Sequence, residues 1–576
     1  MDVQLFSSNF ALFADAPKAV KKLRELILQL AVQGRLVPQN RLEEPASKLA
    51  EKIEAEKIRS KEHGLNTLLT VRVDDEDVPY LLPNGWMWSR LANVGLINPR
   101  NNFDDNNLAS FVPMNLVPQK YGDPVKTETR YWGEIRKGFT HFAENDVVLA
   151  KITPCFQNGK AAVMRGLENR IGAGTTELHV FRPIDGFILP EYVLIYLKSP
   201  EFLSNGIPRM TGTAGQKRVP SDYFAYSPFP LPPLEEQKRI VHKVDQLMRL
   251  CQELEQRQQA KCESRVCLNN VMLAPLKKAA LLPPEEFKQA TTKLIDNFDT
   301  LYDSVDTVVK LRSTVLQLAI QGKLVPQDPS DQSSQELLKR IQSEIVEQQT
   351  AGVYKSSPSL PPISKAEQPF PLPLGWQWSR LRSLVFTLGD GLHGTPKYSK
   401  ETDCYFINGN NFAEGRIIIK PHTKTVALAE IQKHTKRMTS NTVLVSINGT
   451  LGNVAFYNDE NIVLGKSACY FNLASLVDKH FVGRVIESPY FIDYATAHST
   501  GTTIRNLGLK AMNHFPVPLP PLEEQRRIVA KVNQLMALCD DLETKLRQAE
   551  ADSEKLLNAA VGYVLRAVTS VDRGRG

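Results

Sequence analysis

An internal repeat is the feature that most constrains the fold of this 576-residue chain. The heptapeptide Leu-Pro-Pro-Leu-Glu-Glu-Gln stands at 231–237 and again, letter for letter, at 519–525, which is an offset of 288 residues. Extended to Leu254 and Leu542, the two stretches are identical at 18 of 24 positions. Because self-similarity at a fixed offset is the signature of a repeated structural unit, we predict two tandem copies of one unit.

Two further pairs of segments support the duplication. LQLAVQGRLVPQ from Leu28 and LQLAIQGKLVPQ from Leu316 match at 10 of 12 positions with the same offset, and 85–91 returns at 375–381. Between these anchors the copies share spacing but little identity. Each half therefore combines a retained framework with a diverged insert of about 145 residues. One part of the unit had to stay the same while the other was free to change.

The retained framework is predicted to be helical. After Pro233, apolar residues recur every three or four positions, as on one face of a helix, and Glu235 and Glu236 fall in the first turn, where the helix dipole favours anions. Thirty such residues make an arm of about 45 Å. A second retained helix is expected over 20–36 and over 305–324. The residues expected to pack the arms are Leu234, Ile240, Val244, Leu247, Cys251, Leu254, Leu522, Ile528, Val532, Leu535, Cys539 and Leu542.

The inserts show a different pattern. Short β-like runs occur at 147–150, 178–181, 416–419, 442–445 and 468–471, with turn residues between them and helices expected around 191–198 and 479–486. Each insert is therefore predicted to be a compact α+β domain. Trp86 and Trp88 return with the same spacing as Trp376 and Trp378. This repetition favours a packing role for the tryptophans at the entrance of each domain over stacking on DNA bases.

These patterns divide the chain into five parts. We expect an N-terminal helical region and linker (1–84), a first variable domain (85–232), a central helical region and linker (233–374), a second variable domain (375–520) and a C-terminal helix (521–576).

Composition excludes several classes of protein. The chain is 42% hydrophobic and 23% charged, which is ordinary for a globular protein. No run approaches the ~20 apolar residues that cross a bilayer, and the start does not resemble a secretory signal. Seven cysteines without a CxxC pair favour reduced thiols, and hence a cytoplasmic protein, over a disulfide framework or a zinc site.

The net charge of +7 lies in the diverged inserts. Lys and Arg exceed Asp and Glu by three over 85–230 and by five over 375–518. This is the sign that a polyanion binder needs, because basic side chains displace counterions from phosphates. The excess is modest, so charge alone does not identify the partner.

Catalytic and metal motifs are not found in the sequence. A P-loop ending at Gly465-Lys466-Ser467 would need a glycine where the chain has Glu460. An adenine methyltransferase would need a glycine-rich cofactor loop and a characteristic tetrapeptide, and neither is present. No nuclease motif stands out. The histidines do not cluster at metal-ligand spacings. We therefore expect a chain without catalytic residues, metal or cofactor of its own.

Two variable domains that alternate with helices beginning PLPPLEEQ(K/R)RIV resemble the DNA specificity subunit of type I restriction–modification enzymes. The resemblance implies two α+β target-recognition domains, each of which reads one half of a bipartite, asymmetric site in double-stranded DNA. It further implies long antiparallel, coiled-coil-like arms that separate the domains, with an internal pseudo-twofold from the tandem duplication. The implied partners are two methylation subunits and two restriction/translocase subunits, which would carry S-adenosylmethionine, Mg and ATP.

Candidate DNA-contacting residues are the basic and amide side chains on insert loops, because Arg and Lys suit guanine or phosphate and Asn and Gln suit adenine. In the first domain they are Lys151, Gln157, Asn158, Lys160, Arg209, Thr211, Gln216, Lys217 and Arg218. In the second they are His393, Lys397, Asn410, Asn411, Lys436, Arg437, Asn448, Thr500, Thr503 and Arg505. The repeated Thr-Gly-Thr at 211–213 and 500–502 suits a backbone clamp. A duplicated protein–protein adaptor remains the alternative.

Overall fold

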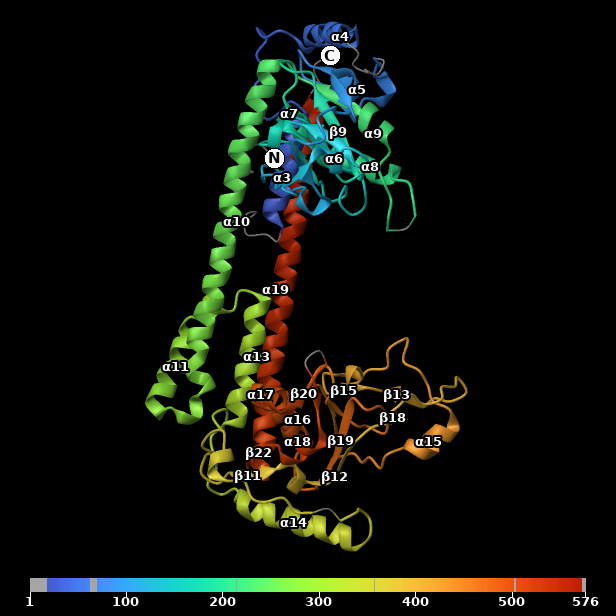
Figure 1. Ribbon diagram of the computed structural model, residues 1–576. Helices are drawn as coiled ribbons and strands as arrows, with labels where there is room; N and C mark the ends of the chain where they lie inside the picture. The colour runs from blue at the N-terminus through green and yellow to red at the C-terminus, as the bar shows by residue number, and fades with distance from the viewer. Residues whose placement is uncertain (1–17, 63–69, 214, 357, 502–503, 572–576) are drawn as a thin grey trace. The chain divides into compact units, whose positions relative to one another are not determined.

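The computed structural model describes residues 18–62, 70–213, 215–356, 358–501 and 504–571, which form two compact units (Figure 1). Unit 1 contains the chain up to Lys261 together with the stretch from Glu550 onward. Unit 2 contains Cys262–Ala549. Each unit holds one diverged insert, so the sequence duplication is also a structural one.

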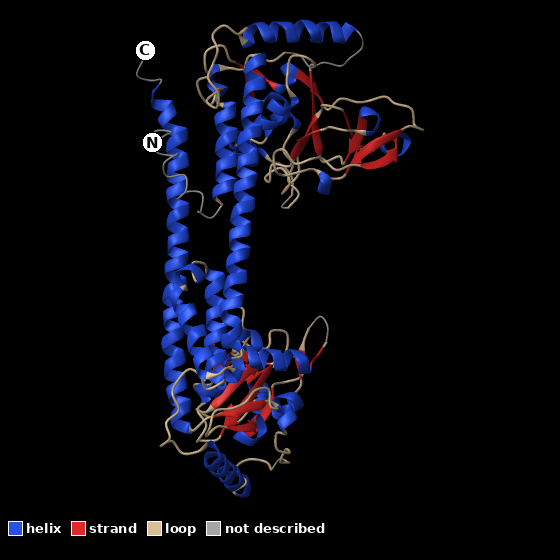
Figure 2. Ribbon diagram, turned by 90° about the vertical axis from the view of Figure 1, so that its left-hand side faces the viewer, coloured by secondary structure: helices blue, strands red, loops and turns tan. Residues whose placement is uncertain are grey.

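Unit 1 is an α+β body in which strands form a layer beside helices (Figure 2). Its helices are α3 (Ala19–Val32), α4 (Ala46–Glu62), α5 (Leu91–Val94), α6 (Trp132–Ile135), α7 (Pro190–Leu197), α8 (Pro200–Gly206), α9 (Ser221–Tyr226) and the start of α10 (Leu234–Lys277). Its strands are β1 (Met87–Arg90), β2 (Gly95–Ile97), β3 (Leu108–Val112), β4 (Glu128–Tyr131), β5 (Thr140–Ala143), β6 (Val147–Ala150), β7 (Ala161–Val163), β8 (Ile171–Gly174), β9 (Leu178–Pro183) and β10 (Pro228–Leu231).

Unit 2 repeats this plan with changes. Its helices are α11 (Pro284–Asp296), α12 (Phe298–Leu301), α13 (Val305–Ile320), α14 (Ser334–Thr350), α15 (Leu428–His434), α16 (Lys479–Glu487), α17 (Pro489–His498), α18 (Leu509–His514) and the start of α19 (Leu522–Val571). Its strands are β11 (Gln377–Arg380), β12 (Val385–Asp390), β13 (Tyr405–Ile407), β14 (Phe412–Ala413), β15 (Arg416–Ile417), β16 (Thr442–Ser446), β17 (Val454–Phe456), β18 (Ile462–Leu464), β19 (Ala468–Leu473), β20 (Ser499–Thr500), β21 (Asn506–Leu507) and β22 (Pro516–Leu519).

One four-stranded sheet has the same topology in both units. The strand order is β2-β9-β6-β7 in unit 1 and β12-β19-β16-β17 in unit 2, and all neighbours are antiparallel. Every residue of β6 and of β16 is buried, which explains their nearly unbroken apolar runs. The predicted α+β domains are confirmed, although only Arg416–Ile417 of the expected run 416–419 is a strand.

Equivalent helices cover this sheet. The predicted helices around 191–198 and 479–486 are α7 and α16, and they pack against β6 and β7 and against β16 and β17. The pairs β1-β10 and β11-β22 also match in register, whereas the other strands diverge. Unit 1 has a second four-stranded sheet, β4-β3-β8-β5, whereas unit 2 has the small pairs β13-β18 and β14-β15. The copies therefore share one structural layer and differ in the other.

The two long helices are longer than the sequence pattern predicts. α10 has 44 residues and α19 has 50, against about thirty expected for each arm. Beyond the repeat, both helices bury apolar residues in small clusters, Leu273 and Leu276 in α10 and Leu557 and Ala560 in α19. α10 begins in unit 1 and ends in unit 2, and α19 begins in unit 2 and ends in unit 1. The chain thus passes between the units along these helices in opposite directions.

The apolar face predicted for the arms lies in the cores. Ile240, Val244, Cys251, Ile528, Val532 and Cys539 are buried. Leu234, Leu247, Leu254, Leu522, Leu535 and Leu542 are half-buried and pack against the same or a neighbouring cluster. Burial also raises the pKa of the thiols of Cys251 and Cys539, in keeping with their role as core residues.

The end of the short retained helix meets the entrance of the variable domain. Gly34 follows α3 with φ of 68°, and a Cβ at this position would lie 2.5 Å from Pro83 and 2.9 Å from Trp86. Gly322 after α13 has the same surroundings and φ of 64°. Only glycine fits both the left-handed conformation and the space, so this element of the repeat had to be retained. The packing role predicted for the tryptophans is confirmed.

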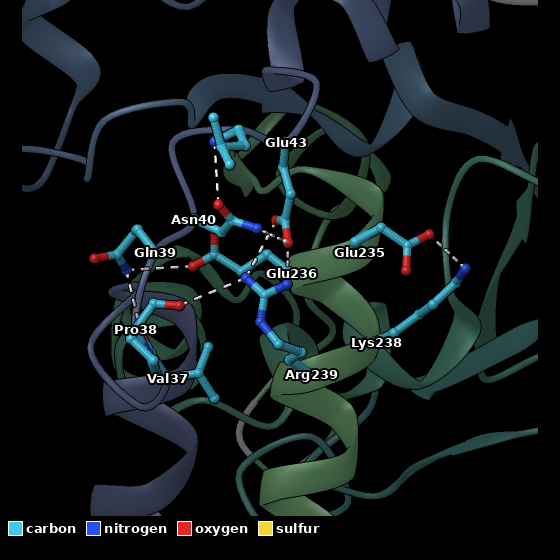
Figure 3. A network of polar contacts seen from close by, with 10 residues as sticks. Val37, Pro38, Gln39, Asn40, Glu43, Glu235, Glu236, Lys238 and Arg239 are labelled. Carbon is cyan, nitrogen blue, oxygen red and sulfur yellow. Dashed lines mark hydrogen bonds and ion pairs between the residues drawn. The ribbon is translucent and has the colours of Figure 1, made fainter.

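A buried carboxylate opens α10 (Figure 3). Glu236 is 1% exposed, and its Oε1 accepts a hydrogen bond of 3.2 Å from Gln39 Nε2, which also donates to the carbonyl oxygen of Gly34. Arg239, one turn further along, forms an ion pair with Glu43. The framework segments on either side of the variable domain are therefore joined by a polar network.

The same network recurs in unit 2. Glu524, 1% exposed, accepts hydrogen bonds from Gln327 Nε2 at 3.2 Å and from Trp376 Nε1 at 2.9 Å, and Arg527 pairs with Asp331 at 2.6 Å. Burial raises the pKa of Glu524, and the hydrogen bonds only partly offset this effect.

The glutamine that follows each buried glutamate binds the variable domain. Gln237 and Gln525 are fully buried, and their Oε1 atoms accept from the backbone N–H of Leu189 (3.0 Å) and of Asp478 (2.9 Å), immediately before α7 and α16. The first helix turn thus connects three elements at once, which explains why Leu-Pro-Pro-Leu-Glu-Glu-Gln is identical in the two copies.

Glu524→Gln should remove a pH dependence of stability. Because the pKa of Glu524 is raised in the folded chain, its carboxyl favours folding most below its unfolded pKa, and this contribution is lost as the pH rises through the folded pKa. The neutral amide keeps an acceptor oxygen and cannot ionise. We expect the thermal midpoint of Glu524→Gln to fall less than that of the wild type between about pH 4.5 and pH 7. Thermal unfolding followed by circular dichroism measures this.

The matched control is Glu523→Gln. Glu523 is the preceding residue, is exposed and pairs with Arg526 at 2.7 Å. Glu523→Gln should leave the pH dependence of the thermal midpoint as in the wild type. If Glu523→Gln and Glu524→Gln gave the same pH dependence, the role assigned to burial would be contradicted.

No helix in the described part of the chain is long and apolar enough to cross a membrane. Among the same residues, no group of His, Cys, Asp and Glu side chains has the arrangement of a metal site.

Candidate nucleic-acid interface

Two loops of unit 1 come together beyond the end of β6. They are residues 151–160, between β6 and β7, and the hairpin of residues 211–218. The Val219 N–H donates to the Lys151 carbonyl oxygen at 2.8 Å, and the Thr153 N–H donates to the Lys217 carbonyl oxygen at 2.9 Å. These backbone bonds hold the hairpin against the β6–β7 loop whatever side chains the two loops carry.

Unit 2 has the same arrangement. Its loops are residues 447–453, between β16 and β17, and the hairpin of β20 and β21, whose described residues are 499–501 and 504–507. The Leu507 N–H donates to the Ile447 carbonyl oxygen at 2.8 Å, and the Gly449 N–H donates to the Arg505 carbonyl oxygen at 2.9 Å. The backbone bonds correspond one to one with those of unit 1, so Lys217 and Arg505 occupy equivalent positions.

Side chains at equivalent positions differ in chemistry. In unit 1, Arg218 makes a two-pronged contact with Glu177, at 2.8 Å for each of its bonds. The equivalent residue of unit 2 is Asn506, whose amide oxygen accepts from Asn448 Nδ2 at 3.2 Å. A shared backbone frame therefore presents a guanidinium in one unit and a pair of amides in the other.

The candidates of the first domain fall into two groups. Six are exposed on loops or hairpin positions: Gln157, Asn158, Arg209, Thr211, Gln216 and Lys217. Three are half-buried: Lys151, Lys160 and Arg218. Lys160 donates from Nζ to the Met114 carbonyl oxygen at 2.9 Å, and Arg218 is held by Glu177. The six exposed side chains are the ones free to contact a nucleic acid.

The candidates of the second domain are spread more widely. Asn448, Thr500 and Arg505 lie on the paired loops, whereas Thr503 lies outside the described residues. The others belong to separate loops: His393, Lys397, Asn410, Asn411, Lys436 and Arg437. His393 Nε2 lies 2.6 Å from Asp390, and Arg437 donates to the Val353 carbonyl oxygen at 3.0 Å. The structure thus brings together three of these ten residues.

Asn411 departs from the expectation of an exposed recognition residue. It is 6% exposed, its Nδ2 donates to the Ile418 carbonyl oxygen at 2.9 Å, and its Oδ1 accepts from the Asn408 N–H at 3.1 Å. Both ends of the amide are used within the domain. Asn411 therefore shapes its loop and does not present its amide to solvent.

Lys198, at the end of α7, is a supporting residue that the sequence reasoning missed. It is 6% exposed, and its Nζ donates to the carbonyl oxygens of Gly159 (2.7 Å) and Gln119 (2.8 Å). Burial lowers the pKa of Lys198 to about 7. The available signal was a lone lysine ending an otherwise apolar helix, since lysine is buried only when it has partners.

His179 supports the hairpin from below. Its ring stacks on Phe224 at 5.0 Å between centroids, and its Nε2 lies 3.1 Å from the Val219 carbonyl oxygen. Burial lowers its pKa to about 4, so the ring is neutral near pH 7. The neutral ring can donate one hydrogen bond to the residue that anchors the hairpin.

Comparisons with known proteins match both units. The family described as the type I restriction modification DNA specificity domain matches residues 83–264 and 375–550. The chain is 36% identical over 553 residues to the type I restriction enzyme EcoAI specificity subunit of Escherichia coli, which covers 94% of this chain and 93% of that protein. It is 34% identical over 559 residues to the EcoEI specificity subunit of the same organism, with 95% and 94% covered.

A solved structure, the HsdS subunit from Thermoanaerobacter tengcongensis, aligns with 84% of this chain and 97% of its own at 20% identity and a TM-score of 0.40. The class defined by the matches is a DNA-recognition subunit, not a catalytic one. This chain belongs to the family of type I restriction enzyme specificity subunits. The resemblance seen in the repeated helices is confirmed, and DNA recognition is favoured over the adaptor alternative.

Lys198→Met should loosen the β6–β7 loop of unit 1. The substitution keeps a long side chain and removes the ammonium, which leaves the Gly159 and Gln119 carbonyl oxygens without their donor, at a cost of about 1–3 kcal/mol for each buried group. We expect backbone amides of 155–161 to exchange with deuterium at least ~10-fold faster in mass spectrometry. The equivalent residues 447–453 of unit 2 serve as the internal control, and equal changes in both loops would contradict the assignment.

Proposed function

We propose that each variable domain reads one half of a bipartite, asymmetric DNA site and that the paired loops of each unit carry the reading side chains. Two observations together support this most directly. The backbone hydrogen bonds that join the paired loops match between the units, and the side chains that the loops carry differ. Equal frames approach a duplex in equal ways, and unequal side chains select different bases.

The long helices are proposed to set the number of unread base pairs between the half-sites. An α-helix rises 1.5 Å per residue, so a run of thirty residues extends over about 45 Å, compared with ~34 Å for one turn of B-DNA. Continuous helices of 44 and 50 residues are long enough for such a spacer. Exposed positions that the two helices share, such as Glu235 and Glu523, would also offer the same surface to identical partner subunits.

The proposed assembly follows from the family. We infer a complex with two methylation subunits and two restriction/translocase subunits, in the cytoplasm, on double-stranded DNA. S-adenosylmethionine, Mg and ATP would be bound by those partners, and this chain would contribute recognition alone. The EcoAI and EcoEI relatives are each called specificity subunits of type I restriction enzymes, which supports this division of labour.

Exchange of one variable domain tests the modular reading. Residues 85–230 replaced by the corresponding segment of another specificity subunit should change one half of the methylated site and leave the other half and the spacer unchanged, because the second frame is intact. Mapping of methylated adenines in cells that express the complex measures the site. A change in both halves would contradict independent reading by the two domains, and the reciprocal exchange of 375–518 is the matched control.

Lys217→Ala and Arg505→Ala test the hairpins. Both residues are exposed at equivalent positions, and each should lower the salt dependence of DNA binding by about one unit of slope if its charge meets a phosphate. Fluorescence anisotropy of the complex with methylation subunits on a specific duplex, titrated with KCl, measures the slope. Lys243→Ala, an exposed site on α10, should leave it unchanged. If both hairpin variants kept the wild-type slope, Lys217 and Arg505 would not be phosphate contacts.

A further inference from the structure

A basic cavity lies in unit 2, between the strand β12, the helix α18 and the chain that follows α14. Its volume is about 680 Å³. The basic residues that line it are Lys355, Arg382, Arg437, Lys510 and His514. No carboxylate is among the described residues that line it. The cavity therefore collects positive charge without an internal counter-ion.

Arg382 lies deeper in the domain than Lys355, Arg437 and Lys510, which are exposed. It is half-buried, and the hydrogen bond found for it is a long one, from Nη1 to the Val385 carbonyl oxygen at 3.4 Å. Burial lowers its pKa, and no neighbouring charge offsets the effect. A half-buried guanidinium with one long hydrogen bond and no carboxylate beside it is poorly compensated, so this position favours an anion from outside the chain.

The wall beside Arg382 is ordered by stacking. Tyr354 and Phe386 lie parallel with ring centroids 4.9 Å apart, and the guanidinium of Arg437 lies 5.0 Å from the Tyr354 ring centroid. Arg437 also donates to the Val353 carbonyl oxygen. These contacts fix the chain after α14 against the domain and keep the cavity open with Arg437 at its edge.

The equivalent positions in unit 1 carry different side chains. Arg90 and Arg380 occupy matching positions, since each donates to the carbonyl oxygen of the last residue of α9 or α18. On this correspondence Arg382, Lys510 and His514 of unit 2 are Ala92, Asp222 and Tyr226 in unit 1. The basic cavity is thus a property of one copy and is not part of the retained framework.

A second cavity borders the hairpin of unit 2 and shares residues with the first. Lys510 and His514 line this second cavity of about 640 Å³ together with Thr500 and Asn506. α18 therefore presents the same two basic side chains to both cavities. An anion held in the first would lie one helix away from the candidate recognition loops.

We propose that the cavity of Arg382, Arg437 and Lys510 is an anion site that takes a phosphate group, either of a free polyphosphate or of a nucleic-acid strand outside the bases read by the hairpin. Guanidinium groups bind phosphate in a two-pronged geometry, and lysine adds a mobile point charge. The site goes beyond the proposed recognition function, because only Arg437 of its three residues is among the candidate DNA contacts and none of the three lies on the paired loops of unit 2.

The first test uses inorganic pyrophosphate and the full chain. We expect saturable binding by isothermal titration calorimetry, at least about tenfold weaker for Arg382→Ala, which corresponds to ~1.4 kcal/mol for a charged hydrogen bond. Arg382→Lys should recover part of the affinity. Lys510→Ala should also weaken binding. Because Lys510 is exposed on α18, this substitution tests the site without removing a half-buried side chain that could matter for folding. Lys400→Ala, exposed elsewhere in unit 2, is the matched control and should bind like the wild type.

The second test distinguishes the two sources of phosphate. Binding of a 30-base-pair duplex of random sequence is measured against KCl concentration for the wild type and for Lys510→Ala. A slope lower by about one assigns the site to a nucleic-acid phosphate, and an unchanged slope together with pyrophosphate binding assigns it to a free ligand. If pyrophosphate does not bind and the slope is also unchanged, the proposal is wrong. The exchange of residues 85–230 leaves this site intact. The test of the proposed recognition function can therefore fail or succeed independently of the test of the anion site.

Discussion

A buried glutamate and a buried glutamine at the start of each long helix determine how the rest of the chain can be built. Glu236 and Gln237, and their counterparts Glu524 and Gln525, are at most 1% exposed and bind segments far apart in the sequence. Polar groups at this depth are tolerated only when their hydrogen bonds are made, so none of the connected segments can change alone. The contact between the long helix and the variable domain, here called the joint, is therefore made by the same side chains in both units.

Variation is possible elsewhere because it avoids this joint. The hairpins 211–218 and 499–507 are held to their neighbouring loops by backbone N–H and carbonyl groups, which every residue supplies. Side chains can then change without loss of the frame, as the change from Arg218 to Asn506 illustrates. Recognition surfaces diverge fastest where the backbone carries the structure and the side chains carry the specificity.

The sequence predicts the frame far better than the site. Repeated apolar periodicity and the terminal glycines after α3 and α13 locate the helices, because these are local signals. It does not reveal that Lys198 reaches Gly159, or that Asn411 is buried, because both depend on contacts between distant segments. With about thirty residues expected for each arm, the pattern stops about 14 residues short in α10 and about 20 in α19, since their last apolar residues, such as Leu276 and Leu557, pack in separate small clusters. Exposure of a loop residue is a tertiary property that composition does not encode.

The two copies differ in charge at equivalent positions around the basic cavity of unit 2. Ala92 and Asp222 in unit 1 stand where unit 2 has Arg382 and Lys510, within otherwise matching elements. Arg382 is half-buried, and its guanidinium makes one long hydrogen bond with no carboxylate lining the same cavity, so a bound anion would stabilise it. The proposed anion site would make the duplicated chain asymmetric in more than its target bases.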